Sequence, residues 1–325
     1  MFGGMSPARA RRQARGWGAR VAENRHWQTL RVDLLLMLVA LIWGSTFIVV
    51  QDSVRLTGPF TFLTLRFGIA ALALAIMFRR RLVRLTRGEI TSGAVIGVFL
   101  FAGYALQTLS LQLTTSSKVG FLTGLYVVMV PPLALVVLGQ RPGRRAVIGV
   151  VLATLGLALL SLRDNLDLAF GWGEALALGG AAGFAAHIVA ISKFAPRADP
   201  INLALVQIAV TAGLSAGVAP LVGEPLVGPP AAVWGAALFL GLVATAFALV
   251  VMNRVQQFTS STRATLIYAL EPVFAGIFGY LAGETLSLPA WIGCGLILAG
   301  MVSAEVHPRA AWRRYRERRN PRPAA

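Results

Sequence analysis

Apolar runs of about 20 residues recur along most of the chain, and they constrain its fold more than any other feature. A helix of roughly 20 apolar residues crosses a bilayer core of about 30 Å with all its backbone groups bonded internally. We assign these runs to residues 33–52, 60–79, 90–112, 118–139, 146–162, 173–193, 201–222, 231–252, 264–283 and 288–305. The sequence therefore predicts an all-α membrane protein with ten transmembrane helices in a lipid bilayer.

The positions of the basic residues predict how these helices are oriented. The formal net charge of +17 is also found in nucleic-acid-binding proteins. Here, however, most of the basic residues lie in two tails, 1–32 and 306–325, and in alternate loops, as the positive-inside rule requires. An additional contact of these clusters with anionic lipid or a partner stays open. We expect both tails to be cytoplasmic and expect no nucleic-acid binding.

The remaining compositional features bear on location. The first 32 residues contain no apolar segment followed by a small-residue cleavage site, so no cleaved signal peptide is expected. Arg is strongly preferred over Lys, and Ala and Gly are abundant, as in proteins from GC-rich bacterial genomes. We therefore predict a multi-pass protein of the bacterial cytoplasmic (inner) membrane.

Segments about 140 residues apart resemble each other, which predicts an internal repeat. The matching stretches are LTLRFGIA (63–70) with LALVQIAV (203–210), VPPLALVVLGQ (130–140) with EPVFAGIFGYLAGE (271–284), and AVIGVVLATLGLALLS (146–161) with PAWIGCGLILAGMVSA (289–304). Chance similarity between apolar helices is the alternative, but Pro131 with Pro272, and Gly149 with Gly293, favour a repeat. The predicted repeats are 33–163 and 172–305. Because each holds five helices, the second enters the membrane from the opposite face, as in many secondary transporters.

Two charged side chains lie deep inside the predicted spans, where charge is costly. Glu271 lies about 10 Å inside the ninth span, with Tyr268 on the same helix face. Burial favours the neutral form of a carboxyl group, so Glu271 is either a substrate or proton site or a structural bridge between helices. Arg66 in the second span either pairs with an acid, binds an anionic group, or extends to the outer surface. The isolated His187 is expected to be a packed or hydrogen-bonded residue rather than a functional one.

Uncharged polar residues form stripes on several spans, which favours a water-accessible cavity over helix contacts alone. The cavity candidates, together with the two charged residues, are Trp43, Thr46, Arg66, Tyr104, Gln107, Tyr126, Gln207, Tyr268 and Glu271. Three prolines within predicted spans, Pro131, Pro132 and Pro272, are candidate hinges because each removes a backbone donor. Stripes from both repeats place the cavity between them.

Metal-site and nucleotide-binding motifs of known enzyme classes are missing from the sequence. There is no HExxH motif and no Walker loop, and every Asp falls at or outside the boundary of a predicted span. The single Cys294 allows no disulfide framework. We therefore expect no enzymatic activity, no cofactor and no bound metal.

Several segments are similar to those of a known family. They are WGSTF (43–47), LRF (65–67), LQTLSLQLTTSSKVGFLTGLYVVMVPPLALVVLGQRP (106–142), LEPVFAGIFGYLAGETL (270–286) and WIGCGLILAG (291–300). The chain resembles the ten-helix, EamA-type branch of the drug/metabolite transporter superfamily. The resemblance implies two inverted five-helix units around a central cavity. Glu271 and Glu284 match acidic positions of the family and Arg66 a basic one, but Gln140 stands where an acid is usual.

These observations predict a secondary active or facilitative transporter. It would move small polar or amphipathic metabolites, such as amino acids or related compounds, by alternating access, and would work as an exporter. Proton exchange at Glu271 and facilitated diffusion are both open, as are a monomer and a homodimer. The alternative from another class is a non-transporting membrane sensor or scaffold component, which would have no water-accessible cavity.

Overall fold

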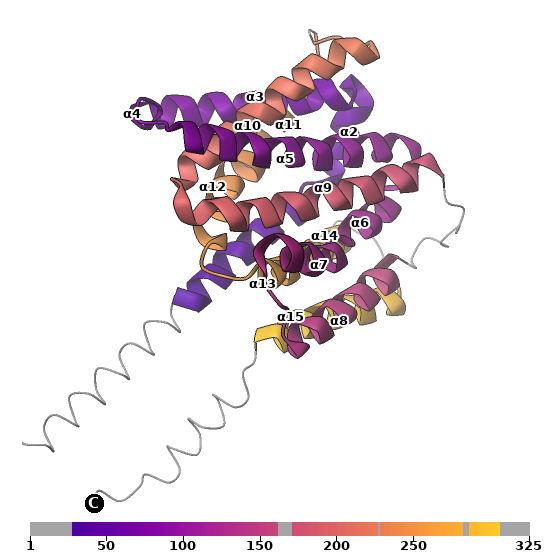
Figure 1. Ribbon diagram of the computed structural model, residues 1–325. Coiled ribbons are helices and arrows are strands. Elements are labelled where there is room, and N and C mark those ends of the chain that lie inside the picture. The colour runs from indigo at the N-terminus through magenta and orange to yellow at the C-terminus, as the bar shows by residue number, and fades with distance from the viewer. Residues whose placement is uncertain (1–27, 162–170, 227, 282–285, 306–325) are drawn as a thin grey trace, which may run out of the picture.

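Every apolar run is helical in the computed structural model, which describes residues 28–161, 171–226, 228–281 and 286–305 (Figure 1). The first half contains the helix Gln28–Gly44, α2 (Phe47–Thr57), α3 (Pro59–Met77), α4 (Arg79–Leu82), α5 (Arg87–Leu113), α6 (Ser116–Gly124), α7 (Tyr126–Leu138) and α8 (Arg144–Ser161). The second half contains α9 (Trp172–Phe194), η2 (Ala195–Arg197), α10 (Pro200–Val218), η3 (Ala219–Val222), α11 (Ala231–Phe239), η4 (Leu240–Phe247), α12 (Ala248–Gln256), α13 (Ser261–Tyr268), α14 (Glu271–Leu281) and α15 (Leu288–Glu305).

Not all of these helices have the length and composition of a membrane span. Seven helical segments of the described chain do, and the bent pair Gln28–Gly44 and Val49–Thr57, which meet at 47°, makes an eighth if it counts as one span. The other two predicted spans correspond to α8 and α15, which fall outside this group; the apolar part of α15, Leu288–Ala304, is shorter. The count of ten spans therefore stays a prediction.

The boundaries differ from the predicted ones at the N-terminal side. Residues 28–32, which we assigned to the basic tail, already belong to the first described helix. The tails at 1–27 and 306–325 and the acidic Glu284 lie outside the described residues.

Two predicted spans are each built from two helices. α6 ends at Gly124 and α7 begins at Tyr126, while α13 ends at Tyr268 and α14 begins at Glu271. The second break has a local cause, because Pro272 has no N–H to donate to the carbonyl of Tyr268. The first break precedes Pro131 and Pro132, which lie inside the continuous α7. The role of the three prolines as hinges stays a prediction.

Helices α8 and α15 approach each other closely at one edge of the bundle (Figure 1). A Cβ on Gly149 would lie 2.6 Å from the carbonyl oxygen of Gly300, and one on Gly156 would lie 2.6 Å from that of Gly293. Such distances allow only glycine, which lets two helices pack backbone to backbone. Both pairs of glycines have the same spacing along their helices, so each helix presents the same contact to the other.

A second pair of close contacts relates α3 to α10. A Cβ on Gly97 of α5 would lie 2.9 Å from the carbonyl oxygen of Gln207 in α10, and one on Gly241 of η4 would lie 2.8 Å from that of Arg66 in α3. In each contact a glycine of a neighbouring helix packs against one backbone carbonyl, that of Arg66 in α3 and that of Gln207 in α10. Arg66 and Gln207 therefore occupy equivalent positions in the two halves of the chain.

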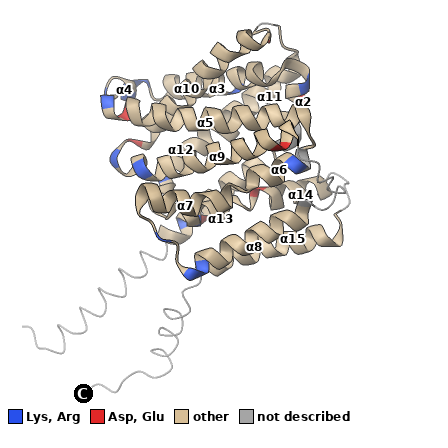
Figure 2. Cartoon of the chain, turned by 45° about the vertical axis from the view of Figure 1, so that its right-hand side comes forward, with Lys and Arg blue, Asp and Glu red and all other residues tan. Residues whose placement is uncertain are grey.

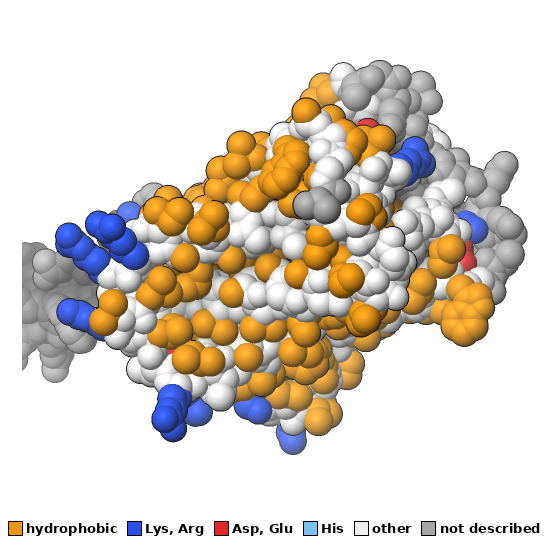
Figure 3. All heavy atoms as spheres, turned by 90° about the horizontal axis from the view of Figure 1, so that it is seen from above, with side chains coloured by type: hydrophobic (Ala, Val, Ile, Leu, Met, Phe, Trp, Pro, Cys, Tyr) orange, Lys and Arg blue, Asp and Glu red, His pale blue; other side chains and the backbone are white. Residues whose placement is uncertain are grey.

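The surface separates into an apolar band and charged margins. Figure 2 shows most Lys and Arg residues at one end of the helices, and we call this the basic end; it carries Arg79, Arg144, Arg197, Arg254 and Arg263. In Figure 3, hydrophobic side chains cover the middle of the visible face and most basic ones lie at its margins. Exposed Leu, Ile, Val and Phe side chains occur on nearly every long helix. This distribution suits a protein whose middle is surrounded by lipid.

Candidate functional site: a central cavity

A cavity in the middle of the bundle brings together most of the sequence-predicted site residues. Eight of them, Trp43, Thr46, Arg66, Tyr104, Gln107, Tyr126, Tyr268 and Glu271, line it, as does Pro272. The other lining residues are mainly apolar: Val50, Leu63, Leu100, Leu111, Leu157, Phe184, Ile188, Met252 and Ala269, with Thr108, Gly120, Thr123, Gly124 and His187. Both halves of the chain contribute, so the cavity lies between them.

Arg66 provides the positive charge of the cavity. Its Nε donates to Thr245 Oγ1 at 2.8 Å, and one terminal nitrogen, Nη2, donates to the hydroxyl of Tyr104 at 3.4 Å. The guanidinium carbon lies 4.9 Å from the centroid of the Tyr104 ring, within the range of a cation–π interaction. Within the described part of the chain, its Nη1 has no hydrogen-bond partner and no carboxylate lies within 4.0 Å. Arg66 is thus oriented by neutral groups and keeps a donor for a ligand.

The π-helix η4 supplies two of the groups that fix this wall. Thr245, the partner of Arg66, lies in η4, and the carbonyl of Ala244 accepts a 2.8 Å hydrogen bond from Trp43 Nε1. A π-helix is rare and shifts the register of the side chains that follow it, and such segments are frequent at functional sites. Here it orients Arg66 and Trp43 towards the same space.

Glu271 provides the negative charge. It is the first residue of α14, directly after the break at Ala269 and Leu270. The first described helix packs against its backbone, because a Cβ on Gly44 would lie 2.5 Å from the Glu271 carbonyl oxygen. The Glu271 carboxylate is half-buried, and it accepts no hydrogen bond from any described residue. The cavity therefore contains a carboxylate and a guanidinium that are not paired with each other.

Aromatic side chains form rigid walls next to both charges. The Tyr104 ring packs edge-on against Phe67 and Phe184, with centroids 5.1 and 5.2 Å away. The Trp43 ring lies 5.7 Å from that of Tyr268. Such contacts hold the rings in place, and ring faces attract cations.

Gln207 is the one cavity candidate that does not line the space. It is fully buried in α10, and its Oε1 lies 2.8 Å from His187 Nε2. His187 is buried and hydrogen-bonded, as expected, and it also lines the cavity. The spacing of polar residues on the predicted seventh span identified a polar helix face that includes Gln207. The packing of α9 against α10, however, places His187 between Gln207 and the cavity.

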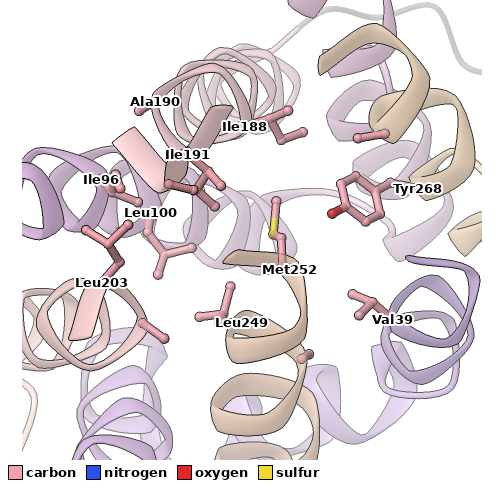
Figure 4. Close-up of a cluster of buried hydrophobic side chains, with 14 of the residues drawn as sticks. Val39, Ile96, Leu100, Ile188, Ala190, Ile191, Leu203, Leu249, Met252 and Tyr268 are labelled. Carbon is pink, nitrogen blue, oxygen red and sulfur yellow. The ribbon is translucent and has the colours of Figure 1, made fainter. Parts of the chain in front are cut away.

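Hydrophobic side chains pack between the cavity and the basic end, and Figure 4 shows this cluster with Val39, Met252 and Tyr268 among its labelled residues. Val39 lies along the first helix between Asp33 and the cavity residue Trp43, and it packs in one cluster with Leu249, Met252 and Tyr268. These four side chains are at most 1% exposed, as expected of apolar groups that pack at crystal-like density. They form a packed layer between the cavity and the basic end.

Gln256 at this layer was missed by the sequence reasoning. It is fully buried, donates to Ile188 O and Ser192 Oγ at 2.7 and 2.8 Å, and accepts from the hydroxyl of Tyr268 at 3.3 Å. It thereby joins α12, α9 and α13 beneath the cavity. Its position at the end of an apolar run was the only available signal.

Comparisons with known proteins show which family this chain is similar to. The model of the EamA-like transporter family matches the chain twice, at residues 30–162 and 171–304. An uncharacterized transporter of Archaeoglobus fulgidus is 35% identical over 286 residues, covering 84% of this chain and 85% of that protein. The uncharacterized inner membrane transporter YedA of Escherichia coli is 27% identical over 282 residues, covering 82% and 88%.

A solved structure supports the fold. A crystal structure that covers 85% of this chain and 98% of its own superposes with a TM-score of 0.71, at 22% sequence identity. The chain is a multi-pass membrane protein with a central cavity, and its relatives are named as transporters. The two family matches together cover most of its length, and the chain belongs to the EamA-like transporter family.

Proposed function

We propose that this protein transports small, amphipathic zwitterions, such as apolar amino acids or related compounds, across the cytoplasmic membrane by alternating access. One observation carries the proposal: Arg66 and Glu271 face the same cavity, and neither is paired with an opposite charge among the described residues. An unpaired charge in such surroundings is costly, and a ligand with both charges relieves both costs.

The cavity offers a complementary group for each part of such a ligand. A carboxylate would accept hydrogen bonds from the free Nη1 of Arg66, which are strong because both partners are charged. An ammonium group would lie at Glu271, near the rings of Tyr126 and Tyr268. An apolar side chain would contact Leu100, Leu157 or similar residues in the wall.

The architecture supports a transport cycle. The family model matches twice, and the Gly149 to Gly300 and Gly156 to Gly293 contacts are reciprocal, as contacts across a two-fold axis are. The matching contacts of Arg66 and Gln207 agree with the same axis. An axis in the membrane plane would relate two inverted five-helix repeats, give ten spans, and place both termini on the basic, cytoplasmic side.

Glu271 would couple transport to protons. A carboxyl group without partners in a half-buried site can exchange a proton for the ammonium group of the substrate, so an inward proton gradient would drive export. The alternative within this function is facilitated diffusion, in which flux follows the substrate gradient alone.

Flux measurements in proteoliposomes test the proposal. The substrate panel contains an apolar amino acid, its amide, which lacks the carboxylate, and its deaminated acid, which lacks the ammonium group. We expect fast flux of the zwitterion and at least tenfold slower flux of both analogues. Equal flux of the three compounds would contradict zwitterion recognition. Binding without flux of any compound would favour a sensor or scaffold instead.

A further inference from the structure

A short motif occurs once in each half of the chain, at the start of the two short helices α6 and α13. The segments are TTSSK (114–118) and TSSTR (259–263). In each, a hydroxyl residue caps the helix, since Thr115 accepts from the backbone N–H of Lys118, and Ser260 accepts from that of Arg263. The third helical residue is then a base in both helices. The motif therefore places a basic side chain in the first turn of each helix.

The two bases form ion pairs at opposite ends of the bundle. Arg263 Nη2 lies 2.5 Å from Asp33 Oδ2 at the basic end, and Lys118 Nζ lies 3.5 Å from Glu174 Oε1 at the other end. Asp33 is on the first helix of the first half, and Glu174 is on the first helix of the second half. Each ion pair thus joins a base of one half to an acid of the other, in the same arrangement.

Each short helix connects its ion pair to the cavity. α13 begins beside Arg263 and ends at Tyr268 in the cavity wall, next to the break before Glu271. α6 begins beside Lys118 and ends at Thr123 and Gly124, also in the wall, next to the break before α7. A rigid helix of two turns that tilts about its break moves its ion pair and its cavity residues together.

The two ion pairs differ in how they are held. Asp33 is buried, and its Oδ1 has no hydrogen-bond partner among the described residues, so Arg263 compensates a charge that nothing else there does. Glu174 also accepts hydrogen bonds from Thr114 Oγ1 at 2.7 Å and from the Gly171 N–H at 2.9 Å. The Lys118 pair can therefore separate without leaving a bare carboxylate, and it is the longer of the two. The packed layer that closes the cavity lies on the side of the tighter pair.

We propose that these two ion pairs are the alternating latches of the transporter, with Arg263 and Asp33 holding the basic end closed while the Lys118 and Glu174 pair loosens. This inference rests on the proposed alternating-access function. In the opposite state of the cycle, the Lys118 pair is tight and the Arg263 pair is separated. The structure is that of a state closed at the basic end.

Thiol labelling of the cavity from each side tests the latches. The reporter is Met252→Cys in a Cys294→Ala background, because Met252 lines the cavity beside the packed layer. A membrane-impermeant methanethiosulfonate is added to reconstituted protein from one side at a time, and the ratio of the two labelling rates is measured. We expect Asp33→Asn to raise labelling from the basic end about fivefold or more, and Glu174→Gln to raise labelling from the other end.

Two controls separate latch loss from general damage. Arg254→Gln removes a charge from the same end without touching an ion pair of the described chain, and it should leave the ratio unchanged. The double exchange of Asp33→Arg with Arg263→Asp should restore the parental ratio. Zwitterion flux is measured on every variant. If the parent protein carries zwitterions but neither neutralised variant shifts the ratio, or both shift it the same way, the latches are refuted and the transport function stands. If the parent carries none, the transport function fails first.

Discussion

The helices α6 and α7 of the first half and α13 and α14 of the second half are built alike but differ in the residue that starts their second helix. Both pairs begin with a capped short helix that carries a base, and both break in the middle of the bundle. α7 then starts with the neutral Tyr126, whereas α14 starts with Glu271. A similar difference separates Arg66 from Gln207. Matched positions therefore build the frame and the two ends, and the positions that differ build the site.

The largest expected effect comes from neutralising Glu271. With Glu271→Gln, zwitterion flux should fall about 100-fold, because a charge-assisted contact contributes roughly 2–3 kcal/mol. The matched control is Tyr126→Phe at the start of α7, which should change flux only a few-fold. Flux assays on both variants in proteoliposomes give the comparison. Equal losses would mean that the site does not depend on the difference between the two halves.

The glycine contacts should respond as symmetric pairs. Gly149→Ala and Gly293→Ala each place a Cβ about 2.5 Å from a backbone oxygen of the facing helix, so each should destabilise the protein by about 2 kcal/mol. Gly295→Ala, also in α15, meets nothing within 4 Å and should be neutral or slightly stabilising. Thermal unfolding in detergent measures all three. A clear difference between Gly149→Ala and Gly293→Ala would argue against the two-fold axis.

Arg66→Gln gives the first half the residue that the second half has. The affinity for the zwitterion should fall about tenfold, because one charge-assisted hydrogen bond, about 1.4 kcal/mol, is lost. The affinity for the amide analogue should not change. Gln207→Leu serves as the counterpart and should leave the zwitterion affinity within about two- to threefold, because Gln207 lies behind His187. Binding titrations measure these affinities. If Arg66→Gln lowered the affinities for the zwitterion and for the amide equally, Arg66 would not recognise the carboxylate.

The smallest expected effect concerns Gln140, whose side chain is hydrogen-bonded to the start of α13. Its Oε1 accepts from the N–H of Ser261 at the start of α13, at 3.3 Å. Gln140→Glu should stabilise the protein by about 0.5 kcal/mol, because a negative charge is favourable at a helix N-terminus. Gln140→Lys should have the opposite sign. The unfolding temperature of the two variants is the readout, and a lower one for Gln140→Glu would contradict the contact.

Hydropathy and charge predicted much of this molecule because the bilayer limits what an apolar run can be. Each run is helical, and eight polar or charged candidates gather at one cavity, since polar groups inside apolar helices turn away from lipid. The break after Gly124 and the π-helix η4 were not predicted, because no composition change accompanies them, whereas the proline Pro272 marks the break after Tyr268.

The missed groups depend on contacts between distant segments. Gln207 stands behind His187, and Gln256 reaches Tyr268 and α9, only because of how the helices pack. The ion pair of Asp33 with Arg263 could not be predicted either, because the two residues lie 230 positions apart in the sequence. The repeated motif at Lys118 and Arg263 was visible in the sequence, and a search for polar as well as apolar repeats would have found it.

Cross-linking one end at a time tests alternating access most directly. In a Cys294→Ala background, Asp33→Cys with Arg263→Cys, or Lys118→Cys with Glu174→Cys, are joined by a short, reducible bifunctional thiol reagent. Zwitterion flux in proteoliposomes is measured before cross-linking, after it, and after reduction. We predict that either cross-link stops flux and that reduction restores it. Continued flux with one end joined would contradict the account.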